Sequence, residues 1–92
     1  MWEEELERRL DRRKVVVTFS PHVFIRREYW NLDLEKIEEA VRFGLRIDQK
    51  CEQPNKICFQ RYFGKENMTY TVIVRYHQTF IEVITAWPNI GR

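Results

Sequence analysis

The spacing of hydrophobic residues changes once along the chain, and this change separates a helical half from a strand half. Up to residue 44, apolar side chains recur mostly three or four positions apart, interrupted by one β-branched run at 14–20. From residue 45 onward they tend to alternate with polar side chains, which is the two-residue period of a half-buried strand. The pattern therefore predicts a helix, a strand and two helices, followed by four strands.

Residues 2–13 predict an amphipathic helix with a narrow apolar stripe. Trp2, Leu6 and Leu10 lie four apart, and the residues between them are Glu and Arg. Side chains four apart share one face of a helix. We expect this stripe to dock on the domain or on a second copy of the chain, so the expected assembly is a homodimer.

The two internal helices have recognisable ends. After the strand KVVVTFS, Ser20 suits an N-cap and Pro21 suits the first position of a helix that extends to about residue 30. Asp33 would cap the second helix. Gly44 would end that helix as a C′ glycine.

The remaining residues predict a four-stranded antiparallel meander. The predicted strands are 45–52, 56–64, 68–77 and 79–88, and their short links QPN, GKEN and HQT favour antiparallel neighbours. Pro88 is expected to end the last strand. With tight turns, the register pairs Cys51 with Cys58, Asp48 with Arg61, and Arg75 with Glu82. Cysteines paired in this way come within disulfide range, but two thiols are favoured in a reducing compartment.

Composition places the chain among ordinary small globular domains. It has 92 residues, of which 43% are hydrophobic and 33% charged, and a net charge of +2. We expect one α+β domain over 14–92, with 1–13 as an added helix. No apolar run approaches ~18 residues, and residues 1–14 lack the apolar segment of a signal peptide. A cytoplasmic protein without membrane contact is therefore expected.

The chain lacks the motifs of the common cofactor-dependent and hydrolytic enzymes. It contains no phosphate-binding glycine loop, no HExxH and no nucleophile elbow. Its two cysteines and two histidines match no close-paired zinc pattern. No metal ion and no cofactor are expected. A metal-free acid–base ribonuclease is the enzyme type that requires the fewest specialised motifs, and it therefore suits so small a chain best.

The segment FSPHVFIRREYW, residues 19–30, carries the first candidate chemistry. His22 would lie in the first turn of a helix as a candidate general base. Arg26 and Tyr29 follow four and seven residues later, on the same face of the helix. A base, a cation and a phenol on one face suit the cleavage of RNA. The alternative is a half-exposed histidine that packs on the start of the helix.

Cationic residues elsewhere supply candidate phosphate ligands. Arg61 and Arg75, in the predicted strands, have the planar guanidinium that can bind phosphate through two hydrogen bonds. Tyr62 and Lys65 add an aromatic ring and a second cation near Arg61, and Arg27 adds charge to the helix. The alternative for both strand arginines is a cross-strand ion pair in the predicted register. For Arg75 the ion pair is the favoured interpretation.

Several segments together resemble a bacterial and archaeal family of small domains related to RelE-like and BrnT-like ribonuclease toxins. VTFSPHVFIRREYWNLDLEKIEEAV is similar to the family's opening strand and helices, QRYFG and YTVIVRY to its middle strands, and FIEVITAWP to its closing strand. The resemblance covers 15–88, and the chain departs from it in the N-terminal helix and the hairpin HQT. It implies a metal-free ribonuclease that an antitoxin neutralises. The residues that match its motifs are His22, Arg26, Arg61 and Thr85.

These observations lead to one expectation for the fold and two for the function. The fold is α+β and RelE-like, with two helices on a mostly antiparallel sheet of about five strands and an extra N-terminal helix. The first function is a toxin-type, metal-independent endoribonuclease that binds RNA. Its catalytic residues would be His22, Arg26 and Arg61, and its substrate-binding residues Tyr62, Lys65, Arg75 and Arg27. The second is a non-catalytic protein-binding or dimerisation module. The enzyme requires the catalytic histidine and the strand arginine on one exposed surface, and the sequence leaves both functions open.

Overall fold

A five-stranded mixed sheet forms the centre of the fold. The computed structural model of the chain describes residues 8–48 and 56–92. In chain order the elements are β1 (Val16–Phe19), α2 (Pro21–Trp30), α3 (Leu34–Phe43), β2 (Leu45–Arg46), β3 (Ile57–Phe63), β4 (Met68–Tyr76) and β5 (Phe80–Ile90). The sheet order is β1-β5-β4-β3-β2, with β1 parallel to β5 and the other neighbours antiparallel. The predicted α+β class and mostly antiparallel sheet are confirmed.

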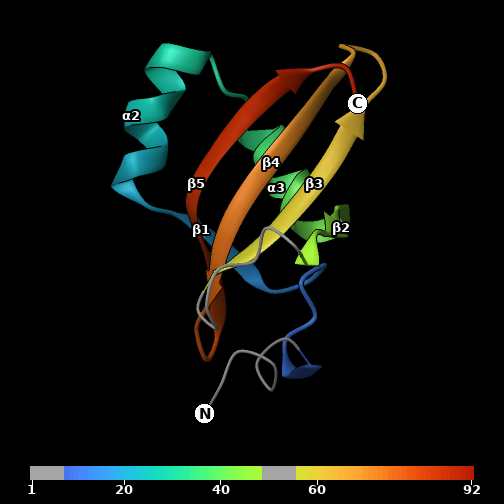
Figure 1. The fold of residues 1–92 in the computed structure, drawn as a ribbon. Helices are drawn as coiled ribbons and strands as arrows, with labels where there is room; N and C mark the ends of the chain where they lie inside the picture. Colours follow the sequence, from blue (N-terminus) through green and yellow to red (C-terminus); the bar gives the residue numbers. More distant parts are fainter. Residues whose placement is uncertain (1–7, 49–55) are drawn as a thin grey trace.

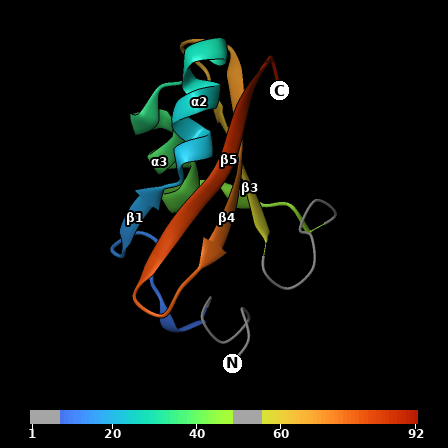
Figure 2. The same cartoon turned by 90° about the vertical axis from the view of Figure 1, so that its left-hand side faces the viewer.

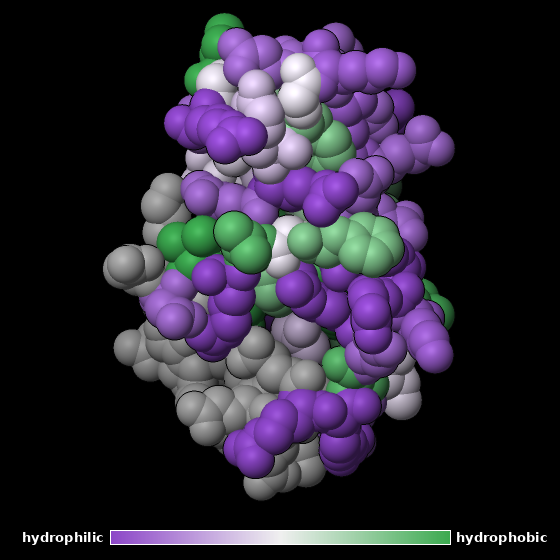
Figure 3. Space-filling view, turned by 90° about the vertical axis from the view of Figure 1, so that its right-hand side faces the viewer, coloured by the Kyte–Doolittle hydropathy of each residue, from purple (hydrophilic) through white to green (hydrophobic). Residues whose placement is uncertain are grey.

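Both helices lie on the same side of the sheet (Figure 1, Figure 2). α3 packs on β3 and β4, and α2 packs along β5. The opposite face of the sheet, called here the helix-free face, carries no helix in the described part of the chain. The side of the molecule at the β2 edge is mostly hydrophilic, with a short row of hydrophobic side chains across its middle (Figure 3).

Alternation along the strands directs one set of apolar side chains toward the helices. Val72 and Val74 in β4 are fully buried, as are their respective ladder partners, Phe59 in β3 and Val83 in β5. The helices and the link between them contribute the facing part of the core, which consists of Val23, Leu32, Ile37, Ala40 and Val41. The two-residue period of the sequence therefore describes the central strands correctly.

α2 begins and ends where its sequence predicts, but Ser20 plays a different part from a simple N-cap. Its side chain makes no capping bond; Oγ instead donates to Ile84 O at 2.8 Å, and the Ser20 N–H donates to Val83 O at 2.9 Å. Pro21 occupies the first turn. Asn31, in the left-handed region at φ 53°, ends the helix. The start of α2 is thus tied directly to β5.

The start of α3 follows the local signals in the sequence. Asp33 Oδ1 accepts a hydrogen bond from the Glu35 N–H at 2.9 Å, so the predicted N-cap is confirmed. Leu32 and Ile37, which flank this cap, are both buried, as in a hydrophobic staple. The Asp33 N–H also donates to Tyr70 Oη at 3.2 Å, which joins the start of α3 to β4.

Gly44 ends α3 as predicted, but for a different reason. It does not adopt the left-handed conformation of a C′ glycine; its φ is −72° and its ψ 165°. A Cβ at this position would lie 2.4 Å from Ala40 O and 2.8 Å from Gln60 O. Both oxygens belong to the backbone and cannot move aside alone. The glycine is therefore required for the close approach of α3 to β3.

The strand on the α3 side of the sheet is shorter than predicted and has another register. β2 contains two residues, and Leu45 pairs with Gln60. This register carries Asp48 away from Arg61, so their predicted pairing is wrong. The cause is the length of the connection to β3, which local turn signals underestimate.

β5 also departs from the prediction, because it continues past Pro88 to Ile90. Pro88 lies opposite Tyr70 in β4. β1 pairs only with residues 80–83 of β5, so the proline lies in a part of β5 that no strand covers on that side. Proline is tolerated at such an edge. At the other end of the hairpin the predicted register is confirmed, since Arg75 faces Glu82.

The N-terminal segment does not form a helix through residue 13. Residues 8 and 9 are helical, and the chain then turns, with the Val15 N–H donating to Asp11 O at 3.0 Å. Leu10 is partly buried against the core. Trp2 and Leu6 lie outside the described residues, so a homodimer through this stripe stays a prediction.

We predict that Gly44→Ala destabilises the domain by about 1–3 kcal/mol, the usual cost of overpacking, because its Cβ would overlap two backbone oxygens. Urea-induced unfolding would measure the change. Gly64→Ala is the matched control, since the nearest atom to its Cβ lies 3.7 Å away in a side chain. Equal stability of the two variants would contradict the close-approach argument.

Candidate functional site

The seven predicted site residues lie on three different surfaces. His22, Arg26 and Arg27 belong to α2, which packs along β5. Arg61 in β3 contacts α3, and Lys65 lies in the turn between β3 and β4. The remaining two, Tyr62 and Arg75, alternate with core residues and therefore belong to the helix-free face.

Arg61 is occupied by a structural ion pair. Its Nε lies 2.9 Å from Glu39 Oε2 in α3, and its Nη1 donates to Phe43 O at 3.4 Å. Asp48, the predicted partner, instead pairs with Arg46. β4 separates the strand of Arg61 from β5, along which α2 packs. The structure therefore does not bring Arg61 together with the α2 histidine.

Tyr62 on the helix-free face already has partners on its ring and on its hydroxyl. The hydroxyl lies 2.8 Å from Asn67 Oδ1, and the Arg92 guanidinium lies 4.6 Å from the ring centroid. The segment that carries Arg92 is fixed by two further bonds: Gly91 N–H donates to Asn67 O, and Thr69 Oγ1 donates to Gly91 O at 2.6 Å. A base could stack on this face of Tyr62 only after displacing Arg92.

Arg75 faces Glu82 without forming the predicted ion pair. Glu82 Oε1 lies 2.9 Å from His77 Nε2, and the His77 ring stacks on Phe80 with 4.3 Å between centroids. Arg75 Nε is buried and has no hydrogen-bond partner among the described residues. The favoured interpretation of Arg75 as half of an ion pair is therefore wrong, although its register is right.

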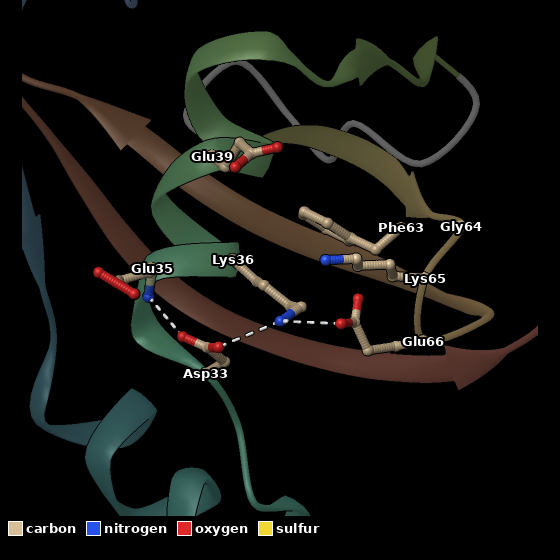
Figure 4. Close-up of a pocket in the computed structure, with 8 residues that line it drawn as sticks. All are labelled: Asp33, Glu35, Lys36, Glu39, Phe63, Gly64, Lys65 and Glu66. Atoms are coloured by element: carbon tan, nitrogen blue, oxygen red, sulfur yellow. Dashed lines mark hydrogen bonds and ion pairs between the residues drawn. The ribbon is translucent and has the colours of Figure 1, made fainter.

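Lys65 lines a shallow hollow between the start of α3 and the β3–β4 turn (Figure 4). The charged groups in this hollow mostly satisfy one another. Lys36 Nζ lies 3.2 Å from Asp33 Oδ2 and 3.8 Å from Glu66 Oε2. Desolvation alone would raise the pKa of Asp33, but the hydrogen bonds from Lys36 and the Glu35 N–H outweigh it and hold that pKa below its ordinary value. The hollow is best explained as part of the fold.

A different hollow, between α2 and β5, has the features of a binding site. It has a volume of about 360 Å³ and is lined by Arg26, Trp30, Trp87, Pro88 and Asn89. Arg26 Nε is buried and has no hydrogen-bond partner in the described structure. A guanidinium with an unused donor beside the exposed indole of Trp30 can bind an anion next to a flat, apolar group. We call this site the α2–β5 hollow.

His22 lies one turn before Arg26 on the same flank of α2, about 6 Å back along the helix axis. It is exposed, and it has no hydrogen bond or ion pair with any described residue. A phosphodiester held by Arg26 would therefore have an accessible imidazole nearby. The predicted grouping of His22 with Arg26 agrees with the structure, whereas the grouping with Arg61 does not.

Sequence reasoning missed the tryptophans of this hollow. Trp87 lies opposite Thr71 in β4, one residue before the predicted end of β5 at Pro88. Its place beside the hollow depends on how β1 positions α2, and no local signal reports this. The sequence does place Trp30 four residues after Arg26, and this spacing indicates that the two side chains share one face of α2.

α2 also exposes an unusual number of large apolar side chains. Val23 is its only buried residue. Phe24, Ile25, Tyr29 and Trp30 are exposed by 46%, 59%, 85% and 51%. A helix that buries one residue and exposes four such side chains has apolar surface available for a partner.

The described residues contain neither a metal cluster nor a membrane helix. No group of three or more His, Cys, Asp or Glu side chains within 8–48 and 56–92 is arranged to hold a metal ion. α2 and α3 have ten residues each, about half of what a bilayer requires, and no other described helix qualifies. Cys58 is buried, and Cys51 lies outside the described part, so their pairing stays a prediction.

We predict that Asp33→Asn removes stability only where wild-type Asp33 is ionised. Because the pKa is lowered in the folded state, its contribution is present above the ordinary value of 3.8 and is lost as the pH falls through the folded value. The variant keeps an N-cap acceptor, so at pH 7 the loss should be at most about 1 kcal/mol. Urea unfolding at neutral and acid pH would measure it.

Glu28→Gln is the control for this experiment, because Glu28 is exposed and makes no hydrogen bond or ion pair with the described residues. Its stability should follow that of the wild type at both pH values. A deficit in Asp33→Asn that is the same at neutral and acid pH would show that the charge of Asp33 does not contribute.

Comparison with known proteins gives no match. No protein-family model matches the chain. No curated protein and no solved structure matches it either. The candidate site is therefore defined by its own residues and geometry, with Arg26 at its centre.

Proposed function

We propose that this domain binds single-stranded RNA at the α2–β5 hollow and cleaves it without a metal ion, with His22 as the general base. The observation that supports this most directly is Arg26, whose buried Nε has no partner and which lines a hollow together with two tryptophans. The layout of two helices on one side of a five-stranded sheet also supports the ribonuclease that the resemblance to RelE-like toxins implies.

The hollow suits a nucleotide better than a simple anion. The Arg26 guanidinium would bind the phosphate, and the indole of Trp30 would stack on a base. Asn89 adds an amide that can donate to and accept from a base edge. Bases in a duplex are already stacked on one another, so this recognition favours single strands.

Cleavage would follow from the position of His22. The imidazole takes the proton of the 2′-hydroxyl, whose oxygen attacks the neighbouring phosphorus. Arg26 stabilises the charge that develops on the phosphoryl oxygens. The bond to the 5′ oxygen breaks, and that oxygen takes up a proton from water. The products are a 2′,3′-cyclic phosphate and a 5′-hydroxyl, and Arg61 has no part in the reaction.

Cleavage of labelled single-stranded RNA in EDTA tests this proposal. Wild type should produce cyclic-phosphate ends, and His22→Ala should reduce the rate by about 100-fold or more. Arg26→Gln should weaken RNA binding as well as cleavage. Arg61→Gln is the control: it removes a half-exposed ion pair, at a cost of about 1 kcal/mol or less, and should cleave at the wild-type rate.

Equal cleavage by wild type and His22→Ala would exclude His22 as the base. Binding without cleavage would reduce the function to an RNA-binding module. Absence of RNA binding, with an unchanged melting temperature, would overturn the assignment of the hollow.

The exposed apolar side chains of α2 support a second candidate function, the binding of a protein partner. In the family that the sequence resembles, this partner would be an antitoxin. Such a partner would cover Phe24, Ile25 and Tyr29, which the domain itself leaves in solvent. This candidate is compatible with RNA binding, because a protein seated on α2 would lie beside the α2–β5 hollow.

If these side chains serve a partner rather than the fold, their loss should cost little stability. Ile25→Ser with Tyr29→Ser should change the free energy of unfolding by at most about 0.5–1 kcal/mol, because exposed substitutions have small effects. Val23→Ser, at the buried position of the same helix, should cost several times more. A large loss in the first variant would assign the exposed residues to folding instead.

A further inference from the structure

Five arginines line a second hollow, which shares no lining residue with the α2–β5 hollow. They are Arg8, Arg9, Arg12, Arg13 and Arg42, and they surround a volume of about 610 Å³ between the N-terminal segment and the end of α3. One acidic side chain, that of Asp11, lies among them, and Phe43 completes one wall. We call this feature the arginine cleft.

Two of the arginines are held in place by backbone carbonyls. Arg42 Nη1 donates to Arg12 O at 3.1 Å and to Val15 O at 2.9 Å. Arg12 Nη1 donates in turn to Val41 O at 2.9 Å. These bonds fasten the N-terminal segment to α3. They also fix two guanidinium groups, which reduces the conformational entropy that a ligand would have to remove.

The charge of the cleft is only partly neutralised. Among the described residues Arg12 contacts a neutral carbonyl and the ring of Phe59, whose centroid lies 4.3 Å from the guanidinium carbon, so its positive charge stays uncompensated. Arg8 makes no hydrogen bond or ion pair with any described residue. Arg13 pairs with Asp11 at 3.4 Å, with 66% and 42% of the side chains exposed, and such pairs contribute little.

The aromatic wall favours a nucleic acid over a simple polyphosphate. Phe43 is 53% exposed at the end of α3, beside the guanidinium groups. Guanidinium groups next to an exposed ring bind the backbone and stack on a base of a single strand.

We infer that the arginine cleft is a second contact surface for single-stranded RNA, in which Arg8, Arg12 and Arg13 bind phosphates and Phe43 offers a stacking surface. This inference rests on the proposed function for the identity of the ligand. The cleft binds the backbone without reading its sequence, and it adds affinity at a distance from the α2–β5 hollow. The domain therefore contacts more than one nucleotide of its substrate.

Salt dependence of binding tests this inference. The probe is a fluorescently labelled 2′-O-methyl oligouridine of 12 nucleotides, which cannot be cleaved by 2′-hydroxyl attack, titrated with the full chain between 50 and 200 mM salt. Each phosphate contact on a single strand contributes about 0.7 to the slope of log K against log salt. The double variant Arg8→Gln/Arg13→Gln should therefore have a slope about 1.4 smaller in magnitude. Its loss of affinity relative to wild type should then shrink about sevenfold between 50 and 200 mM salt.

The matched control is Lys56→Gln with Arg92→Gln, which removes the same charge from the residue before β3 and from residue 92, outside both hollows. Its slope should stay that of the wild type. An unchanged slope in the Arg8/Arg13 variant would overturn the inference. So would an equal fall in the control, because net charge alone would then explain the effect.

Arg26→Gln in the same titration separates this inference from the proposed function. If Arg26→Gln loses affinity and the Arg8/Arg13 variant keeps the wild-type slope, then RNA binds at the α2–β5 hollow and the arginine cleft is not a contact surface. The reverse pattern would assign the cleft and reject the hollow. No binding of the probe by wild type at 50 mM salt would reject both.

Discussion

The parallel pairing of β1 with β5 is the contact on which the rest of the structure depends. It joins residues 16–19 to residues 80–83, at opposite ends of the described chain. Ser20 extends the same contact by binding Val83 O and Ile84 O, so α2 starts directly beside β5 and packs along it. The α2–β5 hollow exists because of this arrangement. Neither Arg26 nor Trp87 would have its present surroundings if β1 paired elsewhere.

Local signals in the sequence were sufficient for the two helices and the strands of the α+β domain, but not for the N-terminal segment, the strand edges or the site. Asp33 and Pro21 fix helix starts through bonds and backbone angles within one turn, so their effects can be predicted without the fold. The register of β2 against β3 is not fixed by local turn signals, and the continuation of β5 through Pro88 depends on where β1 stops. His22 and Arg26 could be grouped because they share one helix. The placement of Arg26 and Trp87 around one hollow could not, since they lie 61 positions apart in the sequence.

The arginines differ chiefly in what neutralises them. Arg61 and Arg42 have carboxylate partners within 2.9 Å, in Glu39 and Glu38. Arg26, Arg75 and Arg12 have no carboxylate partner among the described residues, and the first two keep a buried Nε without an acceptor. Net charge therefore describes this domain poorly. A chain with a net charge of only +2 still presents uncompensated cations, because several of its carboxylates pair with particular partners, such as Glu39 with Arg61 and Glu38 with Arg42.

Pro88 has a consequence for how the domain behaves among other copies of itself. β1 covers only the first part of β5, so the rest of that strand lies at an edge of the sheet. An uncovered edge is a template on which another extended chain can add and begin an aggregate. Proline offers no N–H there, and α2 lies alongside. Pro88, which helps to line the α2–β5 hollow, thus also makes this edge a poor template for strand addition. The hollow can therefore remain open to solvent without promoting the growth of fibrils.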